Sequence, residues 1–232
     1  MSRIETLEPR AAYALWAASY PPHAHNPVMC AEERAMLALM PADLHGQSVL
    51  DAGCGSGRYM LHALDRGAAR VTGVDLSVEM LERAARELGA CRHGGAFELV
   101  HGHLERLPVP DASADLAICG LTIGHLDRLQ AALAELRRVT RPGGTILCSD
   151  VHPIGYALGW QRDFKSGDGH YAVRHTPHFY SHWHAACASL RLEIARVLEP
   201  TLDPADIPVD AHFDPVALEV PVALVFELHR PS

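Results

Sequence analysis

A glycine-rich turn between two aspartates is the segment of this sequence best suited to chemistry. Its glycines are Gly53, Gly55 and Gly57. The turn follows the apolar run 48–51 and precedes the amphipathic run 58–65, and glycines at such a strand-to-helix turn let the backbone approach a ligand closely. Asp51 stands just before the glycines, and Asp75 ends the next apolar run. A carboxylate at the second position can accept hydrogen bonds from both hydroxyls of a ribose.

Two other nucleotide-binding patterns fit this turn less well. The dinucleotide fingerprint G-x-G-x-x-G/A has Arg58 at its last position, where a small residue lets the helix pack closely and a pyrophosphate bind at its N-terminus. A Walker phosphate loop needs a Gly-Lys-Ser/Thr sequence, which this chain lacks. The pattern Asp-x-Gly-x-Gly-x-Gly therefore favours a ligand without phosphates.

Short apolar runs alternate with amphipathic runs around this turn. The apolar runs are 48–51, 69–75, 96–100, 114–121 and 144–149, and the amphipathic runs are 58–65, 78–88 and 126–139. Strands that alternate with helices imply a mostly parallel sheet. Helices are also predicted over 7–20 and 27–40. The late runs 190–198 and 218–228 lack a helix between them, which predicts an antiparallel pair, and Pro221 predicts an edge or bulge.

Composition limits the class of protein. The chain has 232 residues and a formal charge of −8, which argues against a nucleic-acid partner. Its six cysteines form no C-x-x-C motif, so reduced thiols in a cytoplasmic protein are expected. Residues 1–10 are charged rather than apolar, and no apolar run approaches the length of a membrane span, so no membrane association is expected.

Four sequence motifs occur in an order and at a spacing that are typical of one protein family. They are VLDAGCGSGR, VTGVDLS, HGHLERLPVPDASADLAICG and LAELRRVTRPGGTILCSD. Over about residues 10–150 the chain thereby resembles the class I S-adenosylmethionine-dependent methyltransferases that act on small molecules, a group that includes ubiquinone, menaquinone and biotin-pathway enzymes. The resemblance implies an α/β fold. Its three-layer, Rossmann-like sheet has seven strands, mostly parallel with an antiparallel last strand, and helices on both faces. It also implies S-adenosylmethionine as the cofactor.

The resemblance assigns roles to matching positions. The loop of Gly53, Gly55 and Gly57 wraps the amino-acid part of the cofactor, and Asp51 supports the loop and the cofactor's amino group. Asp75 holds the ribose hydroxyls, and Leu76 packs on the adenine.

Four more positions complete the expected cofactor site. His103 stands where the family usually has an aspartate, so the adenine amine is expected to meet either its ring nitrogen or the backbone of Leu104. Cys119 is expected at the methionine end, and Tyr20 is expected to close over the cofactor.

The methyl acceptor should lie at the carboxyl ends of the strands that end near 119–125 and 150–153. His152, oriented by Asp150, is the first candidate for a base, and His125 is the second. The ordinary alternative for each is a surface or helix-capping histidine. Methyltransferases that act on amino groups of nucleic acids usually carry Asp/Asn-Pro-Pro-Tyr/Phe at the end of the first of these strands. This chain reads Cys-Gly-Leu-Thr at 119–122, so a nucleic-acid acceptor is disfavoured.

The whole chain, 1–232, is predicted to form a single methyltransferase domain. Its parts are an N-terminal helical lid (1–46), a cofactor-binding core (47–150), a cap insertion (151–190) and a C-terminal strand pair (191–232). The cap is rich in histidine and aromatic residues, and the expected substrate-pocket residues are Tyr156, Trp160, His175 and His178. No metal site is expected, because the histidine pairs lack a carboxylate or thiolate partner.

The predicted function is methyl transfer to an O, N or C atom of a small, planar or acyl metabolite. Two alternatives stay open: cofactor-dependent cyclisation or rearrangement, and a non-catalytic protein that binds the cofactor. The acceptor and the oligomeric state are not specified by the sequence.

Overall fold

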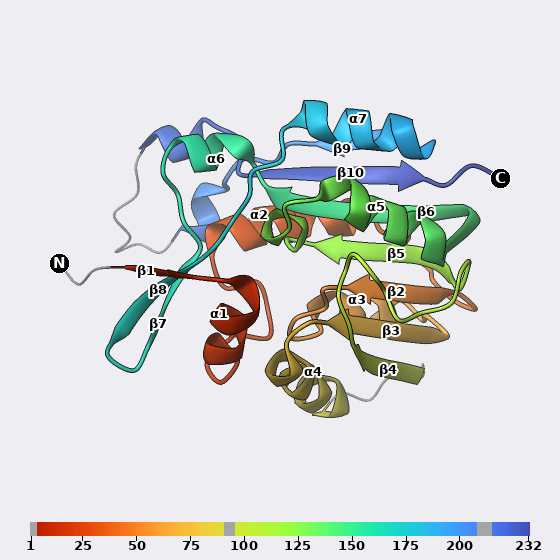
Figure 1. The fold of residues 1–232 in the computed structure, drawn as a ribbon, viewed down its shortest axis with the longest axis horizontal. Coiled ribbons are helices and arrows are strands. Elements are labelled where there is room, and N and C mark those ends of the chain that lie inside the picture. Colours follow the sequence, from red (N-terminus) through yellow and green to blue (C-terminus); the bar gives the residue numbers. More distant parts are fainter. Residues whose placement is uncertain (1–3, 91–95, 208–214) are drawn as a thin grey trace.

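A seven-stranded sheet forms the centre of the computed structural model, which describes residues 4–90, 96–207 and 215–232 (Figure 1). Its spatial order is β4-β3-β2-β5-β6-β10-β9. The strands are β2 (Ser48–Ala52), β3 (Arg70–Asp75), β4 (Ala96–His101), β5 (Ala114–Gly120), β6 (Thr140–Val151), β9 (Glu193–Leu198) and β10 (Ala223–His229). β10 is antiparallel to both β6 and β9, and the other pairs are parallel. The predicted fold class is confirmed.

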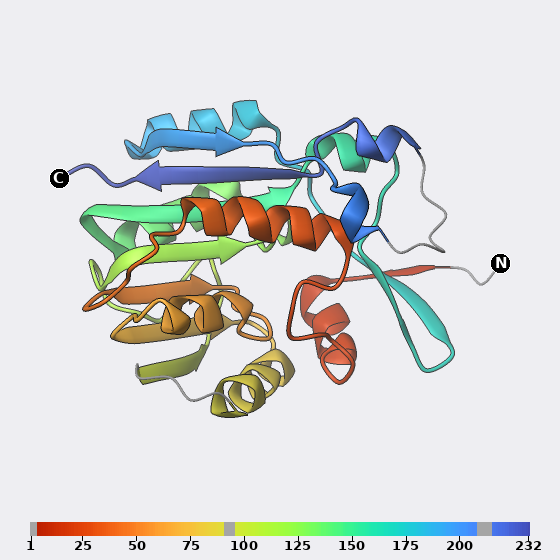
Figure 2. The ribbon, with the colours of Figure 1, turned by 180° about the vertical axis from the view of Figure 1, so that it is seen from behind.

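Helices cover both faces of the sheet because successive strand residues point to opposite sides. Leu50, Ala117 and Leu224 pack toward α5 (Leu129–Val139) and α7 (Tyr180–Leu190). Their neighbours Val49, Leu116 and Val225 pack toward the opposite face. Three helices cover that face: α2 (Pro27–Leu39), α3 (Arg58–Asp65) and α4 (Val78–Ala90) (Figure 2).

Residues 180–190 do not belong to the predicted cap, because they form helix α7. α7 connects β6 to β9, so residues 180–190 are a crossover helix and not part of a cap. Trp183 is fully buried and stacks on Phe226 at 4.3 Å between ring centroids. Of the residues of α7, only Trp183, Ala186 and Cys187 are buried. Because this apolar face is narrow, the sequence of the helix does not show a clear amphipathic pattern.

A second, three-stranded sheet lies beyond the carboxyl ends of the parallel strands (Figure 1). It consists of β1 (Glu5–Leu7), β8 (Gly169–Val173) and β7 (Asp163–Ser166), with β1 parallel to β8. Helix α1 (Pro9–Trp16) packs on it, and Trp16 stacks on Phe164 at 4.6 Å. We call residues 5–20 and 162–174 the roof.

Several boundaries therefore differ from those predicted. The N-terminal segment 1–46 is not one helical lid, because β1 precedes α1, which ends at Trp16, while α2 packs on β6 and β10. In the predicted cap, the short helix α6 (Pro153–Ala157) precedes the roof segment 162–174 along the chain. Pro221 lies before β10, which is an interior strand, and the sheet irregularity falls at Glu227–Leu228 instead.

The remaining elements are short 3-10 helices: η1 (Ile123–His125), η2 (Pro204–Asp206) and η3 (Pro215–Leu218). The described cysteines are free thiols, and Cys91 lies outside the described residues. Among the helices in the described ranges, none combines the length and apolar character needed to cross a membrane.

Candidate functional site

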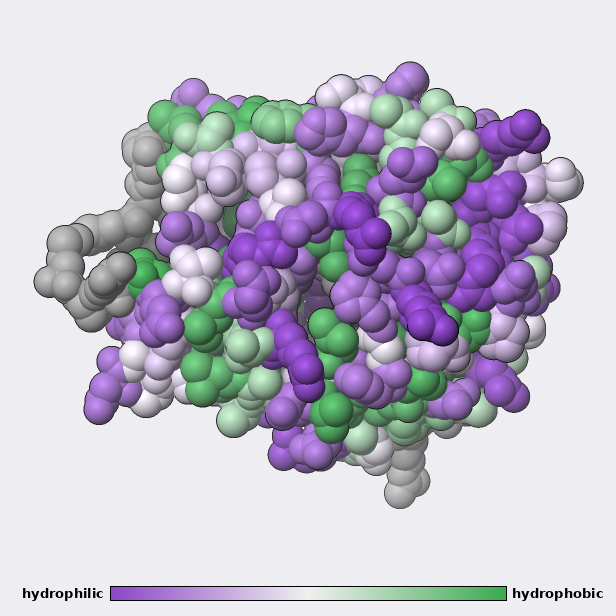
Figure 3. Space-filling view, viewed as in Figure 1, coloured by the Kyte–Doolittle hydropathy of each residue, from purple (hydrophilic) through white to green (hydrophobic). Residues whose placement is uncertain are grey.

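A cavity of about 460 Å³ lies between the roof and the carboxyl ends of β2, β3 and β5. Its walls combine the glycine loop, residues 75–77, residues 102–105 and residues 120–122 with roof side chains from α1 and the segment before β7. A cavity of this size is typical of a small-molecule site. In Figure 3, hydrophilic residues surround a hollow near the middle of the face seen in Figure 1.

The glycine loop has a conformation that side chains would not permit. Gly53 has a φ of +79°, and a Cβ there would lie 2.4 Å from Cγ2 of Thr122. Gly57, with a φ of +87°, is the residue that precedes α3. The Gly53 N–H donates to the Val74 carbonyl at 2.7 Å, which fixes the loop beside β3. The backbone therefore forms the floor of the cavity directly.

The two aspartates have different surroundings. Asp75 accepts hydrogen bonds from the N–H of Gly55 at 2.8 Å and from the N–H of Ser77 at 2.9 Å. Asp51 is only 1% exposed, and its Oδ2 has no hydrogen-bond partner. Burial raises the pKa of Asp51 to about 7. Asp51 also lines the cavity, so its incompletely partnered carboxylate suits a ligand that brings a hydrogen-bond donor or a positive charge.

The other predicted cofactor residues divide into two groups. Tyr20, Leu76, His103 and Leu104 line the cavity, as do Gly53 and Gly55. His103 accepts a hydrogen bond from the Glu105 N–H at Nδ1, which fixes the ring orientation. Cys119 and Gly57 do not line the cavity. Cys119 is fully buried in the core under α5, because the alternation along β5 points its side chain to the face of the sheet that α5 covers.

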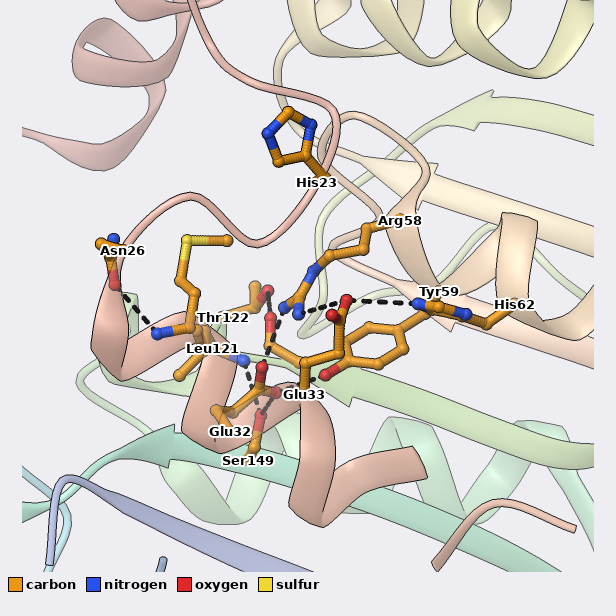
Figure 4. Close-up of polar contacts among 12 residues, drawn as sticks. His23, Asn26, Glu32, Glu33, Arg58, Tyr59, His62, Leu121, Thr122 and Ser149 are labelled. Carbon is orange, nitrogen blue, oxygen red and sulfur yellow. Dashed lines mark hydrogen bonds and ion pairs between the residues drawn. The ribbon is translucent and has the colours of Figure 1, made fainter. Parts of the chain in front are cut away.

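A buried charge network supports the cavity floor, and Glu32 of α2 is its centre (Figure 4). The Glu32 carboxylate is fully buried and accepts from Arg58 at 2.9 Å, the Tyr59 hydroxyl at 2.7 Å and the Ser149 hydroxyl at 2.5 Å. Ser149 in turn accepts from the N–H of Leu121. The network thereby joins α2, the start of α3 and the ends of β5 and β6.

One residue in this network holds an uncommon backbone conformation. Leu121 lines the cavity and has a φ of +52°, in the left-handed region that leucine rarely adopts. Its N–H donates to both the carbonyl and the hydroxyl of Ser149, each at 3.0 Å. Hydrogen bonds from β6 therefore hold the strained end of β5 in place.

Three roof and wall residues form a chain of hydrogen bonds that we call the relay: Tyr13, His125 and Arg162. Arg162 donates to the Tyr13 hydroxyl at 2.5 Å, and that hydroxyl lies 2.9 Å from Nε2 of His125. Burial lowers the pKa of His125 to about 3 and raises the pKa of Tyr13 to about 12. Both groups are therefore uncharged at neutral pH.

His152 is not placed at the cavity, which corrects its assignment as the first candidate base. Its Nδ1 accepts from the N–H of Ile154, and its Nε2 lies 3.2 Å from Glu199. It is the N-terminal cap of α6, which is the ordinary alternative considered for it. Asp150 is buried with Oδ2 unpartnered, and burial raises its pKa to about 7.

Replacing His152 by alanine should accordingly lower stability and leave ligand binding unchanged. Loss of an N-cap costs about 1 kcal/mol. Urea unfolding would measure that loss, and calorimetric titration with the cofactor expected from the sequence should give the affinity of the unaltered protein. A tenfold loss of affinity with unchanged stability would contradict the capping role.

The predicted substrate-pocket residues lie outside the cavity wall. Tyr156 is 54% exposed on α6, and Trp160 packs with Ala217 and Val222 in a separate apolar cluster. His178 is buried and bonds the Leu126 carbonyl through Nε2. The His175 ring lies behind the backbone of Gly124, with Nε2 unpartnered. Within the described ranges, no group of metal-ligating side chains converges.

Neither Glu32 nor Arg162 is among the functional residues predicted from the sequence. Glu32 did leave a signal, because it shares the apolar face of α2 with Met29 and Met36 at helical spacing. A charge on such a face indicates a buried partner. Arg162 gave no local signal, because its partners Tyr13 and Leu121 are distant in the sequence.

Known proteins resemble this chain in sequence and fold. Residues 50–148 match a family described as a methyltransferase domain. A malonyl-[acyl-carrier protein] O-methyltransferase of Serratia marcescens is 38% identical over 169 residues, which covers 70% of this chain and 60% of that protein. An uncharacterized protein of Haemophilus influenzae is 33% identical over 150 residues, covering 62% of this chain and 59% of that protein. The chain spans between 48% and 60% of the first curated relatives that it matches.

A solved structure extends the likeness to most of the fold. The S-adenosylmethionine-dependent methyltransferase from Mesorhizobium loti aligns with a TM-score of 0.67 and 23% identity, covering 86% of this chain and 98% of that chain. At that identity the likeness concerns the fold alone.

Proposed function

Residues 50–148 belong to the methyltransferase domain family, and from this premise we propose that the chain transfers a methyl group from S-adenosylmethionine to a small acyl metabolite. S-adenosylmethionine supplies a methyl group activated by its bond to a positively charged sulfur. The residues of this chain bind, orient and enclose the two reactants, which is how positioning accelerates a displacement.

The observation that carries the proposal is Asp51, a buried residue of the cavity lining whose carboxylate has an oxygen without a hydrogen-bond partner. The amino group of the cofactor's methionine part is a donor of suitable charge for it. Asp75 lies one strand away, and each of its oxygens can accept a further hydrogen bond from a ribose hydroxyl. Leu76 and His103 wall the same cavity and are suited to hold the adenine. The donor set therefore fits S-adenosylmethionine.

An acyl acceptor is favoured by two further considerations. Several relatives are malonyl-[acyl-carrier protein] O-methyltransferases, whose acceptors are acyl groups. The roof also contributes aromatic side chains, because Tyr13 and Tyr20 line the cavity. Such a roof excludes water from the reacting atoms and packs against an acyl chain.

S-adenosylhomocysteine, the product that remains after S-adenosylmethionine has lost its methyl group, is a stable probe of the cofactor site. Replacing Asp75 by alanine should weaken its binding at least tenfold. The reason is that a charge-assisted contact to the ribose is worth more than about 1.4 kcal/mol. Calorimetric titration measures the affinity, and circular dichroism verifies the fold, since Asp75 also accepts backbone hydrogen bonds from the loop.

The control is Glu98→Ala, which removes an exposed acid from neighbouring β4. Equal affinity in the Asp75 variant, or absence of S-adenosylhomocysteine binding to the unaltered protein, would contradict the cofactor assignment. Methyl transfer itself is tested with labelled S-adenosylmethionine and a panel of short acyl compounds.

A further inference from the structure

We propose that the methyl acceptor presents a carboxylate and that Arg162 of the roof binds it. The inference rests on the proposed function and specifies its substrate class. Arg162 lies between α6 and β7, lines the cavity and comes within 3.4 Å of the Leu121 carbonyl. Leu121 follows β5, and the carboxyl end of this strand is where an acceptor is expected.

The charge of Arg162 is not matched within the protein. Across residues 4–90, 96–207 and 215–232, no carboxylate forms an ion pair with it. Three other arginines that line the cavity are paired: Arg58 with Glu32 and Glu33, Arg128 with Glu105, and Arg174 with Glu8 and Asp127. Arg10, the remaining arginine of the lining, is exposed to solvent, so its charge is hydrated. A desolvated cation without a counter-charge is costly, and an anionic ligand removes that cost.

The relay keeps this cation available. Nδ1 of His125 faces the Arg174 carbonyl at 3.2 Å, and because a carbonyl only accepts, this nitrogen carries the proton. Nε2 therefore accepts from the Tyr13 hydroxyl, whose oxygen in turn accepts from Arg162. Tyr13 and His125 are hydrogen-bonded and uncharged. The relay therefore orients the Arg162 guanidinium without neutralising its positive charge.

The nearest acid does not supply the missing charge. Asp150 interacts with Arg162 only at a distance longer than an ion pair, and burial raises the pKa of Asp150 to about 7. Part of it is therefore protonated at neutral pH. Among the described residues, Arg162 forms hydrogen bonds through Nη1 alone, which leaves Nε and Nη2 for a two-pronged contact with a carboxylate.

A carboxylate acceptor also needs no base, because it is already ionised at neutral pH. One carboxylate oxygen forms a bond to the methyl carbon, the carbon–sulfur bond breaks, and its electron pair stays on sulfur. The products are a methyl ester and S-adenosylhomocysteine, and no proton is transferred. His125, neutral and bonded through both nitrogens, and His152, capping α6, therefore need not act as bases.

Titration of the protein loaded with S-adenosylhomocysteine separates this site from the cofactor site. The probes are malonate and malonamide, which have similar shapes but differ in charge. We expect malonate to bind and malonamide to bind at least tenfold more weakly. Arg162→Met should weaken malonate at least tenfold and change S-adenosylhomocysteine affinity less than twofold. Arg86→Met is the matched control, because it removes an exposed arginine of α4 that does not line the cavity.

Each contrary result has a distinct meaning. If Arg162→Met weakens S-adenosylhomocysteine but not 5′-methylthioadenosine, which lacks the amino-acid part, Arg162 binds the cofactor's carboxylate and the inference is wrong. Equal binding of malonate and malonamide would also overturn it, while leaving the proposed function intact. Failure of S-adenosylhomocysteine to bind the unaltered protein would overturn both.

A second variant keeps the test decisive if Arg162→Met does not fold. Tyr13→Phe removes the hydroxyl that orients Arg162 and leaves the ring in place. It should weaken malonate by about threefold, the loss of one hydrogen bond, without affecting S-adenosylhomocysteine. Unchanged malonate affinity in Tyr13→Phe would contradict the role of the relay.

Discussion

The affinity for S-adenosylhomocysteine is expected to fall about tenfold for each pH unit below 7. The unliganded protein holds a proton on Asp51 under these conditions, because burial raises the pKa of that carboxyl to about 7. The ligand's ammonium group favours the ionised carboxylate, so binding must displace the proton. Affinity therefore rises with pH up to about 7 and levels off above it. Calorimetry in buffers of different ionisation enthalpy measures the proton released.

The isosteric variant Asp51→Asn isolates this effect. It should bind S-adenosylhomocysteine weakly at every pH, because its amide cannot match the ammonium charge, and its affinity should not change between pH 5.5 and 8. A flat profile in the unaltered protein would show that Asp51 does not meet the cofactor's amino group. A matching slope in the variant would assign the proton to another group.

Glu32→Ala is expected to lower the free energy of unfolding by about 3–5 kcal/mol. The Arg58 side chain is only 11% exposed and would lose its fully buried partner. The hydroxyls of Tyr59 and Ser149 would lose their acceptor in the same step. Urea unfolding at pH 7 measures the change. Because Arg58 and Leu121 line the cavity, a drop in S-adenosylhomocysteine affinity should accompany it.

Glu33→Ala provides the comparison on the same helix. Glu33 binds the same arginine at 3.1 Å, but its side chain is 22% exposed, so solvent replaces much of the contact. Its loss should cost about 1 kcal/mol or less. Equal costs at the two positions would mean that burial of Glu32 does not determine the strength of the network.

The elements that were predicted correctly are specified by patterns within a few consecutive residues of the sequence. Helix α3 has the predicted bounds 58–65, because a glycine turn precedes it and its apolar residues recur at helical spacing. Strands β2 and β3 are short apolar runs that end at an acid or a glycine turn. Such signals need only a few consecutive residues, and a domain core built from alternating strands and helices repeats them.

The parts that were missed depend on distant partners. β1 has only three residues and forms because β8 offers an open edge. The cofactor half of the cavity follows local motifs, so most of its predicted residues line the wall. The acceptor half is assembled by the roof, and neither the position of Arg162 nor the distance of His152 from the cavity is encoded by neighbouring residues.

The pairing of β1 with β8 has a consequence for the order of folding. Glu5 and Leu7 meet Tyr171 and Val173, so their partners are separated by most of the described chain. Closing so large a loop is entropically expensive, and contacts of this kind form late. The central sheet contributes the floor and can assemble from nearer contacts. A refolding chain should therefore acquire an open cofactor cleft first and an enclosed reaction chamber only after β1 has paired with β8.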